Sequence, residues 1–357
     1  MSADSPGPLP PPEPLSAIFA RLIANTGPIS LMHYMGESNL RYYASRDPLG
    51  VAGDFITAPE ISQMFGELIG LWLADIWIRA GRQEPVHYVE LGPGRGTLAR
   101  DALTAAKRYG LNPSVHFVEG STELRDRQLA TVPSAQFHHD LSSIPMYGPV
   151  LIIGNEFLDA LPVRQLVKTA EGWRERMVAH QGGKFVPIAG TRPMDAAVPE
   201  ARREAAEGTI IETCPGAAAT VFEIAGRLLE QGGAALLIDY GHDQIRDGSS
   251  LQALRDHRMV DPFAMPGEAD LTAHVDFATL ATIASSRGVQ WLGTVPQGRW
   301  LRALGIDTRA ENLAAFAPQH AAAIHAARDR LIGEGQMGLL FKVMGLAAPS
   351  WPVGAGF

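Results

Sequence analysis

The sequence contains very little cysteine: Cys214 is the only one among its 357 residues. One thiol excludes an intramolecular disulfide framework and any metal site built from several cysteines. We interpret Cys214 as a small core residue beside Pro215, and a nucleophilic thiol is the alternative. The chain is long enough, and at 46% apolar residues hydrophobic enough, to bury a large core without disulfide bonds.

An excess of basic residues is also absent. The 38 acidic residues outnumber the 30 lysines and arginines, so the formal net charge is −8. Broad nucleic-acid binding needs a basic surface, and this balance therefore argues against it. The acidic charge suits a protein partner that presents a basic side chain.

No hydrophobic run is long enough to span a membrane, because the most apolar segment, residues 61–78, is interrupted by Glu67 and Asp75. Its apolar side chains recur at steps of three and four residues, which predicts an amphipathic helix packed on the core. The Pro-rich residues 1–14 contain no basic residue and no apolar centre, so we expect a disordered tail without a targeting signal. We therefore expect a cytoplasmic bacterial protein without membrane insertion.

The sequence does contain a glycine-rich turn between an apolar run and a helix start. The run at residues 86–91 includes Glu90, and Gly92, Gly94 and Gly96 follow at alternate positions. Open α/β sheets build nucleotide sites from such strand–turn–helix units. Glycines let a ligand lie against the backbone, and the helix start offers free N–H groups.

The spacing in this turn distinguishes between nucleotides. A dinucleotide fingerprint needs glycine at its sixth position, which is Thr97 here, and the chain has no P-loop motif. S-adenosylmethionine (SAM) carries an ammonium and a sulfonium group instead of a phosphate, and an acidic residue such as Glu90 would attract both. Taken alone, the turn fits a simple strand–helix connection equally well.

Acidic residues also follow other apolar runs, where Glu119, Asp140 and Asp239 each end or follow a short predicted strand. Parallel strands present their carboxyl ends at one edge of a sheet, where ligands bind. We expect Glu119 to accept hydrogen bonds from ribose hydroxyl groups, although a solvated strand end is the alternative. We expect Asp140 to bind an adenine amino group. The most apolar run, residues 149–154, predicts a central strand buried on both faces.

Several motifs together resemble a known family. Residues 53–67, 90–96 and 155–162, followed by 273–277 and 337–343, are similar to the MidA-like SAM-dependent methyltransferases of mitochondria and bacteria. The resemblance covers nearly all the chain after its first dozen residues. It implies an α/β, class I (Rossmann-like) fold with a seven-stranded, mostly parallel sheet and helices on both faces. It also implies SAM as cofactor and an arginine of a protein as acceptor, such as one in a core subunit of respiratory complex I.

We assign the cofactor site to residues around these turns and to a lid that precedes the first strand. For the lid residues Asp54, Thr57 and Ser62, helix capping is the alternative. The expected cofactor-binding residues are Asp54, Thr57, Ser62, Glu90, Gly92, Gly94, Gly96, Glu119, Asp140 and Asn155.

Carboxylates are the expected catalytic groups. An arginine nitrogen is a poor nucleophile because its lone pair is delocalised, and carboxylates can hold the guanidinium and accept the proton that it releases. Glu156 and Asp159 follow the central strand, and their spacing of three places both on one side if the turn is helical. For both, a helix cap or a salt bridge is the alternative. His274 is a further candidate for proton transfer, and a hydrogen bond to the backbone at a helix start is its alternative. We assign no metal, because His138 and His139 are neighbours on a strand and point to opposite faces.

The chain is expected to comprise a disordered tail (1–14), a helical N-terminal lid section (15–80) and a methyltransferase domain (81–357). Two insertions in this domain, near residues 163–210 and 243–272, would build the acceptor site. Partial alternation between glycine-containing turns predicts a β-meander in the first insertion. A helix is expected from Asp270, and short strands near 289–295 and 337–344 would complete the sheet.

Three functions of different classes remain open. The chain is a SAM-dependent protein arginine methyltransferase, a methyltransferase of a small molecule or another protein nucleophile, or a SAM-binding assembly factor with little catalysis. A nicotinamide dehydrogenase is disfavoured by Thr97 in the glycine turn. The acceptor position, the number of methyl groups and the oligomeric state are not specified by the sequence.

Overall fold

A mixed eight-stranded sheet forms the centre of the computed structural model, which describes residues 13–45 and 56–357. Its strands are β2 (His87–Leu91), β3 (Ser114–Val118), β4 (Gln136–His138), β5 (Val150–Asn155), β10 (Gly233–His242), β14 (Val275–Asp276), β15 (Gln290–Pro296) and β16 (Phe341–Ala347). The order is β15–β16–β10–β5–β2–β3–β4, with β14 beside β10.

Five neighbouring strands, from β4 through β3, β2 and β5 to β10, run parallel, whereas β16 runs antiparallel between β10 and β15. The sequence predicts seven strands. The structure has an eighth because the two residues of β14 pair with Gly241 and His242 at the end of β10. The last strand begins later than predicted, since residues 337–340 form a helical turn. All residues of β5 are buried, as its uninterrupted apolar run predicts.

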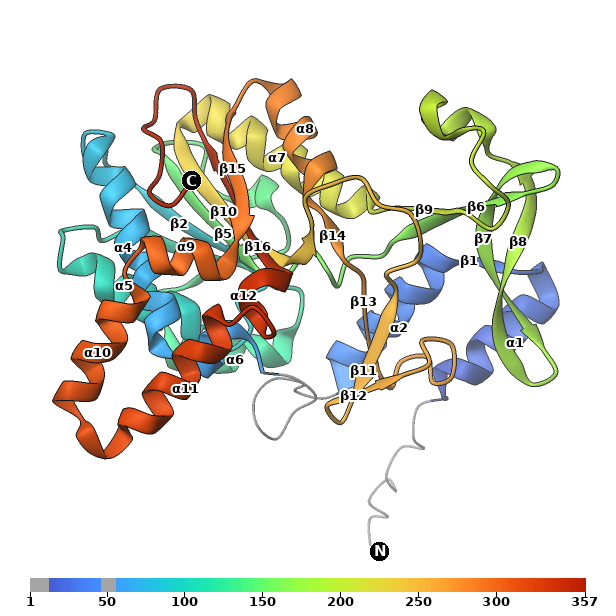
Figure 1. Cartoon of the computed structure of the whole chain (residues 1–357), viewed down its shortest axis with the longest axis horizontal. Helices are drawn as coiled ribbons and strands as arrows, with labels where there is room; N and C mark the ends of the chain where they lie inside the picture. The colour runs from blue at the N-terminus through green and yellow to red at the C-terminus, as the bar shows by residue number, and fades with distance from the viewer. Residues whose placement is uncertain (1–12, 46–55) are drawn as a thin grey trace, which may run out of the picture.

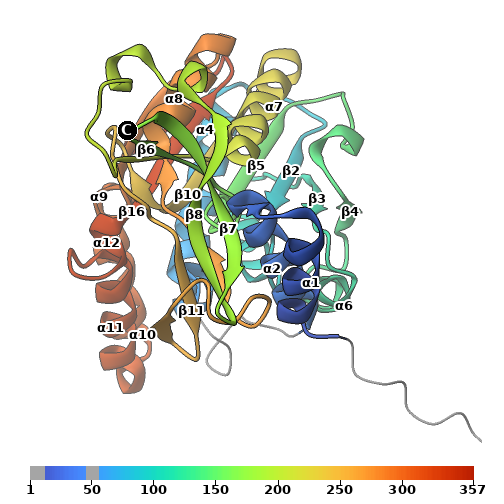
Figure 2. The ribbon, with the colours of Figure 1, turned by 90° about the vertical axis from the view of Figure 1, so that its right-hand side faces the viewer.

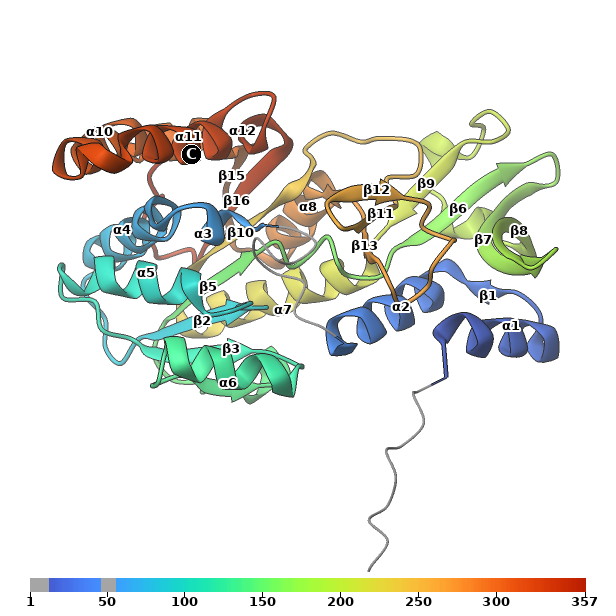
Figure 3. The same ribbon diagram turned by 90° about the horizontal axis from the view of Figure 1, so that it is seen from below.

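Helices cover both faces of this sheet. On one face lie α4 (Gln63–Arg79) and α5 (Thr97–Lys107), and on the other α7 (Pro215–Gln231) and α8 (Phe277–Arg287) (Figure 3). The three- and four-residue steps predicted in α4 bury side chains such as Phe65, Leu68 and Trp72. At Gly70 a Cβ atom would lie 2.1 Å from the Ala102 carbonyl oxygen, so only glycine permits the close approach of α4 to α5.

A second, antiparallel sheet lies at the opposite end of the molecule from α4 and α5 (Figure 1). It contains β1 (Ile29–Ser30), β6 (Arg164–Thr169), β7 (Gly172–Gln181), β8 (Lys184–Pro193) and β9 (Ile210–Thr213). The antiparallel pairs β6–β7 and β7–β8 form the meander that the alternation predicts. A small third sheet contains β11 (Gln252–Arg255), β12 (Arg258–Val260) and β13 (Asp270–Thr272).

The N-terminal section, predicted as one helical unit, is divided between two cores. Helices α1 (Leu15–Thr26) and α2 (Leu31–Ser45) pack beside β7 through Phe19 and Tyr34 (Figure 2). In contrast, α3 (Ala58–Ile61) and α4 pack with the central sheet. The division follows from β1, which pairs with β7 and so attaches α1 and α2 to the second sheet.

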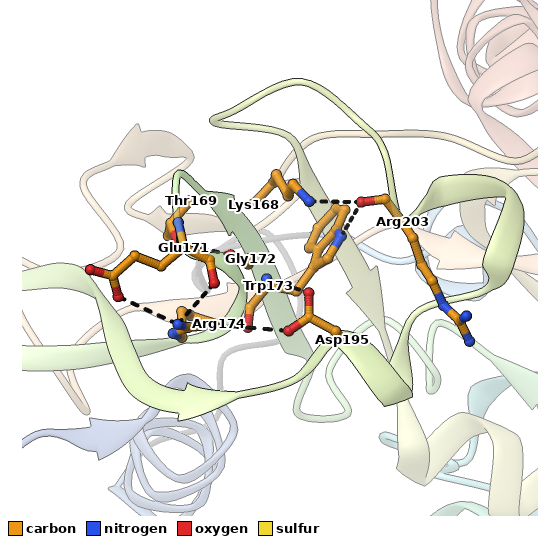
Figure 4. Close-up of polar contacts among 8 residues, drawn as sticks. All are labelled: Lys168, Thr169, Glu171, Gly172, Trp173, Arg174, Asp195 and Arg203. Atoms are coloured by element: carbon orange, nitrogen blue, oxygen red, sulfur yellow. Dashed lines mark hydrogen bonds and ion pairs between the residues drawn. The ribbon is translucent and has the colours of Figure 1, made fainter.

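The second sheet has its own small core around the fully buried Trp173 (Figure 4). The Trp173 Nε1 and Lys168 Nζ atoms both donate to the Arg203 carbonyl oxygen, at 3.0 and 2.8 Å. The Asp195 carboxylate accepts from the Trp173 backbone N–H at 3.1 Å. These bonds fix the connection between β8 and β9, which contains the short 3₁₀ turns η2 (Asp195–Ala197) and η3 (Glu200–Arg202).

The remaining elements are α6 (Thr122–Thr131), α9 (Gln297–Ala303), α10 (Ile306–Phe316), α11 (Ala321–Ile332), α12 (Met337–Leu340), η1 (Leu141–Ser143) and η4 (Pro318–His320). In the part of the chain that the structure describes, no helix has the length and apolar character needed to cross a membrane. The sulfur of Cys214 accepts the Ala217 N–H at the start of α7, and burial raises the pKa of its thiol. A raised thiol pKa favours the structural interpretation of Cys214 over the nucleophilic one.

Candidate active site

Two cavities meet at the C-terminal ends of the central strands. The first has a volume of about 600 Å³ and is lined by the turns after β2, β3 and β5. The second, of about 350 Å³, lies between the third sheet, α11 and α12. Tyr43 and Glu156 line both cavities, so the two cavities are immediate neighbours on either side of these side chains.

The glycine turn after β2 has the backbone that its sequence predicts. Gly92, Gly94 and Gly96 have φ values of 60°, 55° and 78°, a left-handed region that other residues rarely adopt. Gly92 and Gly94 line the first cavity, whereas Gly96 lies behind it as the residue before α5. A Cβ atom at Gly92 would lie 2.9 Å from the Phe157 ring.

Glu90 presents a buried carboxylate to the first cavity. Its Oε2 atom accepts a hydrogen bond from the Tyr88 hydroxyl at 2.6 Å. Burial raises the pKa of Glu90 to about 8, although the Tyr88 bond opposes this change. A cationic ligand in the cavity would favour the ionised form of Glu90 and would bind more tightly to it.

Acceptor groups are also found on the other sides of the first cavity. Glu119 accepts from the Ser121 N–H at 2.7 Å and from Gln128 Nε2 at 3.0 Å, which leaves oxygen lone pairs for a ligand. Asn155 donates through Nδ2 to Glu156 Oε1 at 3.1 Å, while its Oδ1 atom is buried without a partner among the described residues. A ligand ammonium group would satisfy this oxygen. The acidic and acceptor-rich lining therefore fits SAM better than a pyrophosphate.

Not all predicted cofactor residues lie at this cavity. Thr57 lines it, but Asp54 falls outside the described residues. The Ser62 hydroxyl accepts a hydrogen bond from the Met64 N–H at 3.2 Å. Ser62 therefore caps α4, which is the alternative role considered for this residue. The exposed Asp140 carboxylate caps η1 through Ser142 and lines neither cavity.

His274 is also placed away from both cavities. Its Nδ1 atom lies 3.0 Å from the Arg246 guanidinium, and the Tyr240 ring, which does line the second cavity, packs against the His274 imidazole. Burial and the Arg246 charge lower the pKa of His274. His274 lines neither cavity, so the structure gives no support for its predicted catalytic role.

Glu156, Asp159 and Asp270 bring three carboxylates to the second cavity. Asp159 and Asp270 are buried, and Glu156 is partly buried where the cavities join. Burial raises the pKa of Glu156 to about 7, and burial together with the Asp239 charge raises that of Asp159 well above its usual range. A guanidinium group in this cavity would relieve the repulsion among the three carboxylates.

The predicted spacing places Glu156 and Asp159 on one side only if their turn is helical. In the structure this turn is not helical. Glu156 has φ +51°, and the amides of residues 157–159 donate to the Asp239 carboxylate instead of to helix carbonyls. Both side chains nevertheless line the second cavity. Their convergence comes from a left-handed residue and a buried acceptor, which a residue spacing does not reveal.

Sequence reasoning missed several residues of the second cavity. The Tyr43 hydroxyl donates to Asp270 Oδ1 at 2.8 Å, and Gln252 Nε2 donates to the Tyr240 hydroxyl at 2.8 Å. Asp270 lies in the three-residue β13, where the sequence predicts a helix start. Arg330 of α11 lines the same cavity from a distant part of the sequence. Residues 13–45 and 56–357 include no group of three His, Cys, Asp or Glu side chains able to hold a metal ion.

Comparison with known proteins gives a consistent result. A family model for S-adenosyl-L-methionine-dependent methyltransferases matches residues 68–295. Protein arginine methyltransferase NDUFAF7, mitochondrial, is 34% identical in Danio rerio, over 92% of this chain and 85% of that protein. The Homo sapiens protein of the same name is 36% identical, over 80% of this chain and 72% of that protein.

Solved structures agree with these relatives. A member of the COG1565 superfamily from Burkholderia thailandensis, bound to S-adenosyl-homocysteine, superposes with a TM-score of 0.80. It is 30% identical, and the match covers 95% of each chain. A native structure of a COG1565 superfamily protein from the same organism gives a TM-score of 0.78 at 31% identity, over 98% of this chain and 99% of that chain.

Proposed function

This chain belongs to the family of S-adenosyl-L-methionine-dependent methyltransferases, and on that premise we propose that it methylates an arginine side chain of a protein. One observation carries the choice of acceptor. The cavity beside the cofactor space is lined by the carboxylates of Glu156, Asp159 and Asp270, and a guanidinium is the side-chain group that such a cavity complements best.

The residues of the first cavity are proposed to hold the cofactor. Glu90 and Asn155 Oδ1 suit its cationic groups, Glu119 suits its hydroxyl groups, and the turn at Gly92 and Gly94 lets it lie against the backbone. When bound, SAM supplies an electrophilic methyl group attached to a positively charged sulfur. Asp54, which lies outside the described residues, stays a proposed cofactor-binding residue. Ser62 and Asp140 carry no such assignment, because neither lines the first cavity.

The residues of the second cavity are proposed to bind and activate the acceptor. Glu156 and Asp270 hold the guanidinium by charge-assisted hydrogen bonds, and the Tyr43 hydroxyl fixes the Asp270 carboxylate. The attacking nitrogen gains the methyl group and loses one proton. Glu156 accepts this proton, because a carboxylate whose pKa is about 7 is suited to act as a base near neutral pH. Asp159 contributes a further buried acidic group.

The form of the second cavity supports a protein acceptor over a small molecule. Met259 of β12 and Leu340 of α12 line this cavity while 62% and 46% exposed to solvent. A contiguous apolar patch beside a binding cavity is typical of a surface that contacts another protein, and these two side chains would contribute to such a patch. The alternatives are a small-molecule methyltransferase and a SAM-binding assembly factor. The mass spectrometry described below distinguishes both from a protein arginine methyltransferase.

The finer assignments are proposals of the same kind. The family resemblance makes a core subunit of respiratory complex I the first acceptor to test. We propose that the seven-stranded path of the sheet, without β14, corresponds to the class I methyltransferase sheet. A cytoplasmic location stays a prediction, because the named relatives are mitochondrial proteins.

Mass spectrometry of complex I subunits tests the proposal. Subunits are compared from cells with the gene, without it, and with Glu156→Gln in its place. We expect an arginine methylation that is lost on deletion and restored by the intact protein but not by Glu156→Gln. An unchanged set of arginine methylations after deletion would contradict a complex I acceptor. Restoration of the methylation by Glu156→Gln would contradict the role of Glu156 as base.

A further inference from the structure

Asp239 lies at the C-terminal end of β10, directly beside the turn that follows β5. Its carboxylate is 1% exposed and lines neither cavity. It accepts hydrogen bonds from four backbone amides. These are the N–H groups of Phe157 (3.1 Å), Leu158 (2.9 Å) and Asp159 (3.2 Å) on Oδ2, and of Tyr240 (3.0 Å) on Oδ1. A single side chain therefore holds the turn that begins at Glu156.

This turn needs an external partner because its backbone is not regular. Glu156 has φ +51°, and a non-glycine residue rarely adopts this left-handed conformation without surrounding contacts. The Glu156 N–H donates to the Ile238 carbonyl oxygen at 2.8 Å, so the residue before Asp239 fixes Glu156 from the other side. Consecutive residues of β10 thus hold both ends of the backbone that presents Glu156.

A carboxylate is the group that can accept all four of these bonds. An ionised aspartate has only acceptor sites, whereas an asparagine in the same place has one acceptor oxygen and would direct N–H groups toward an amide donor. The converging amide dipoles also favour a negative charge at this position. Shape alone would be preserved by asparagine, but the hydrogen-bond pattern would not.

We propose that Asp239 is a positioning residue for the methyl transfer, and that it acts by fixing the turn from which Glu156 and Asp159 face the acceptor. This inference rests on the proposed function, because it concerns the same reaction. Asp239 itself contacts neither cavity, so it acts through the residues of the turn.

The hydrogen bonds to Asp239, and not its charge, carry the inference. Burial and the nearby Glu156 charge raise the pKa of Asp239 to about 8, although the bonds from the turn amides oppose this change. Glu156, whose pKa is raised to about 7, ionises at a lower pH than Asp239. The test therefore rests on kcat and on amide hydrogen exchange, which report the position of the turn.

The experiment compares Asp239→Asn with Asp195→Asn. Asp195 also accepts a backbone N–H, that of Trp173, but in the small core of the second sheet (Figure 4). For Asp239→Asn we expect kcat to fall about 10- to 100-fold with the KM for SAM unchanged, since small displacements of catalytic groups have effects of this size. We also expect faster amide hydrogen exchange at residues 157–159. Asp195→Asn should resemble the wild-type protein in every measurement.

A second variant serves if Asp239→Asn does not fold. Asp239→Glu keeps the carboxyl group but moves it by one methylene group, so kcat should fall while the KM for SAM stays unchanged. Wild-type kcat in a folded Asp239 variant, or unchanged exchange at residues 157–159, would overturn the inference. Absence of arginine methylation by the wild-type protein would instead overturn the proposed function. Unlike kcat, the exchange measurement does not depend on the acceptor.

Discussion

The backbone N–H of Ala58 donates a hydrogen bond to Glu156 Oε1 across 2.9 Å. This bond joins the start of α3 to the turn after β5, at the point where the two cavities meet. On its other side α3 is fixed by Glu60 Oε1, which accepts from the Thr97 hydroxyl at 2.6 Å beside the glycine turn. The helix therefore covers the proposed cofactor space and orients the proposed base at the same time.

Replacing Glu156 by glutamine should separate catalysis from cofactor binding. Glutamine keeps an oxygen that can accept the Ala58 N–H, so α3 should stay in place. Glutamine cannot take up the proton that the arginine releases. We therefore expect kcat to fall by about 100- to 10,000-fold, the range for loss of a general base. Initial rates and calorimetric titration with SAM measure the two effects. An equal loss of SAM affinity would indicate a binding role instead.

The activity should increase with pH through about 7, where the Glu156 carboxyl ionises. Only the ionised form accepts a proton, so at saturating SAM the kcat/KM for the acceptor protein should be low on the acidic side of this value and level above it. The profile is measured from initial rates with SAM and the acceptor protein in buffers of constant ionic strength. A midpoint near the ordinary pKa of a glutamate would contradict the assignment of Glu156 as the base.

Gly94→Val should abolish SAM binding, because Gly94 has φ 55° and lines the first cavity. Gly182 provides a matched control. It has φ 56°, lies in the β7–β8 turn, and a Cβ atom there would meet nothing within 4 Å. Calorimetry should detect no binding by Gly94→Val and wild-type affinity for Gly182→Val. Equal affinities for the two folded variants would contradict the cofactor site.

The affinity for SAM should depend on the ionisation of Glu90. Its pKa of about 8 means that the free protein carries a mostly neutral Glu90 at neutral pH, and binding of a cation should release that proton. Wild-type affinity should therefore rise about tenfold more than that of Glu90→Gln between about pH 7 and pH 9. Titrations in buffers of different ionisation enthalpy report the proton release. Parallel pH dependences in the two proteins would refute this linkage.

A chain of three histidines should make the fold sensitive to acid. His116 lies 2.9 Å from His87 and 3.0 Å from His138, nitrogen to nitrogen, so both of its ring nitrogens already have partners. Burial lowers the pKa of His116 to about 4. The unfolded chain, with an ordinary pKa near 6.5, binds this proton more readily, so stability present above about pH 6.5 is lost as the pH falls toward 4.

Urea unfolding of the wild-type protein and His116→Gln measures this effect. The wild-type protein should lose about 1–3 kcal/mol more than the variant between about pH 6.5 and pH 4. The comparison is necessary because Glu90 and Glu156 have raised pKa values and act in the opposite direction, stabilising the fold as they become protonated. Identical losses in both proteins would show that the histidine chain does not bind the proton differently on unfolding.

The parts of the fold that depend on local pattern could be predicted from the sequence. The buried β5, the glycine turn at Gly92 and the amphipathic α4 each follow from periodicity or from a residue's conformational range. Asp270 could not be found in this way, because β13 has three residues and forms only through pairing with β11. The hydrogen bond between Tyr43 and Asp270 could not be predicted either, because a contact between residues distant in sequence leaves no local signal.

Other differences have the same origin. Asp239 and Asp140 both fit the pattern of an acidic residue after a predicted strand. Asp239, however, is buried against the turn from Glu156, whereas Asp140 caps an exposed 3₁₀ turn. Their different roles depend on which segment lies opposite each carboxylate. That information is in the order of the strands, and the order is not visible in any single motif.

Methyl transfer from SAM labelled on its methyl group, with protein from gene-deleted cells as acceptor, tests the central claim most directly. Acid hydrolysis of the acceptor protein then identifies the labelled amino acid. We predict label in methylated arginine with the wild-type enzyme, the same with Asp195→Asn, and none above background with Glu156→Gln. Label in a different amino acid or in small molecules only, or full labelling by Glu156→Gln, would contradict the assignment of the three-carboxylate cavity as an arginine site.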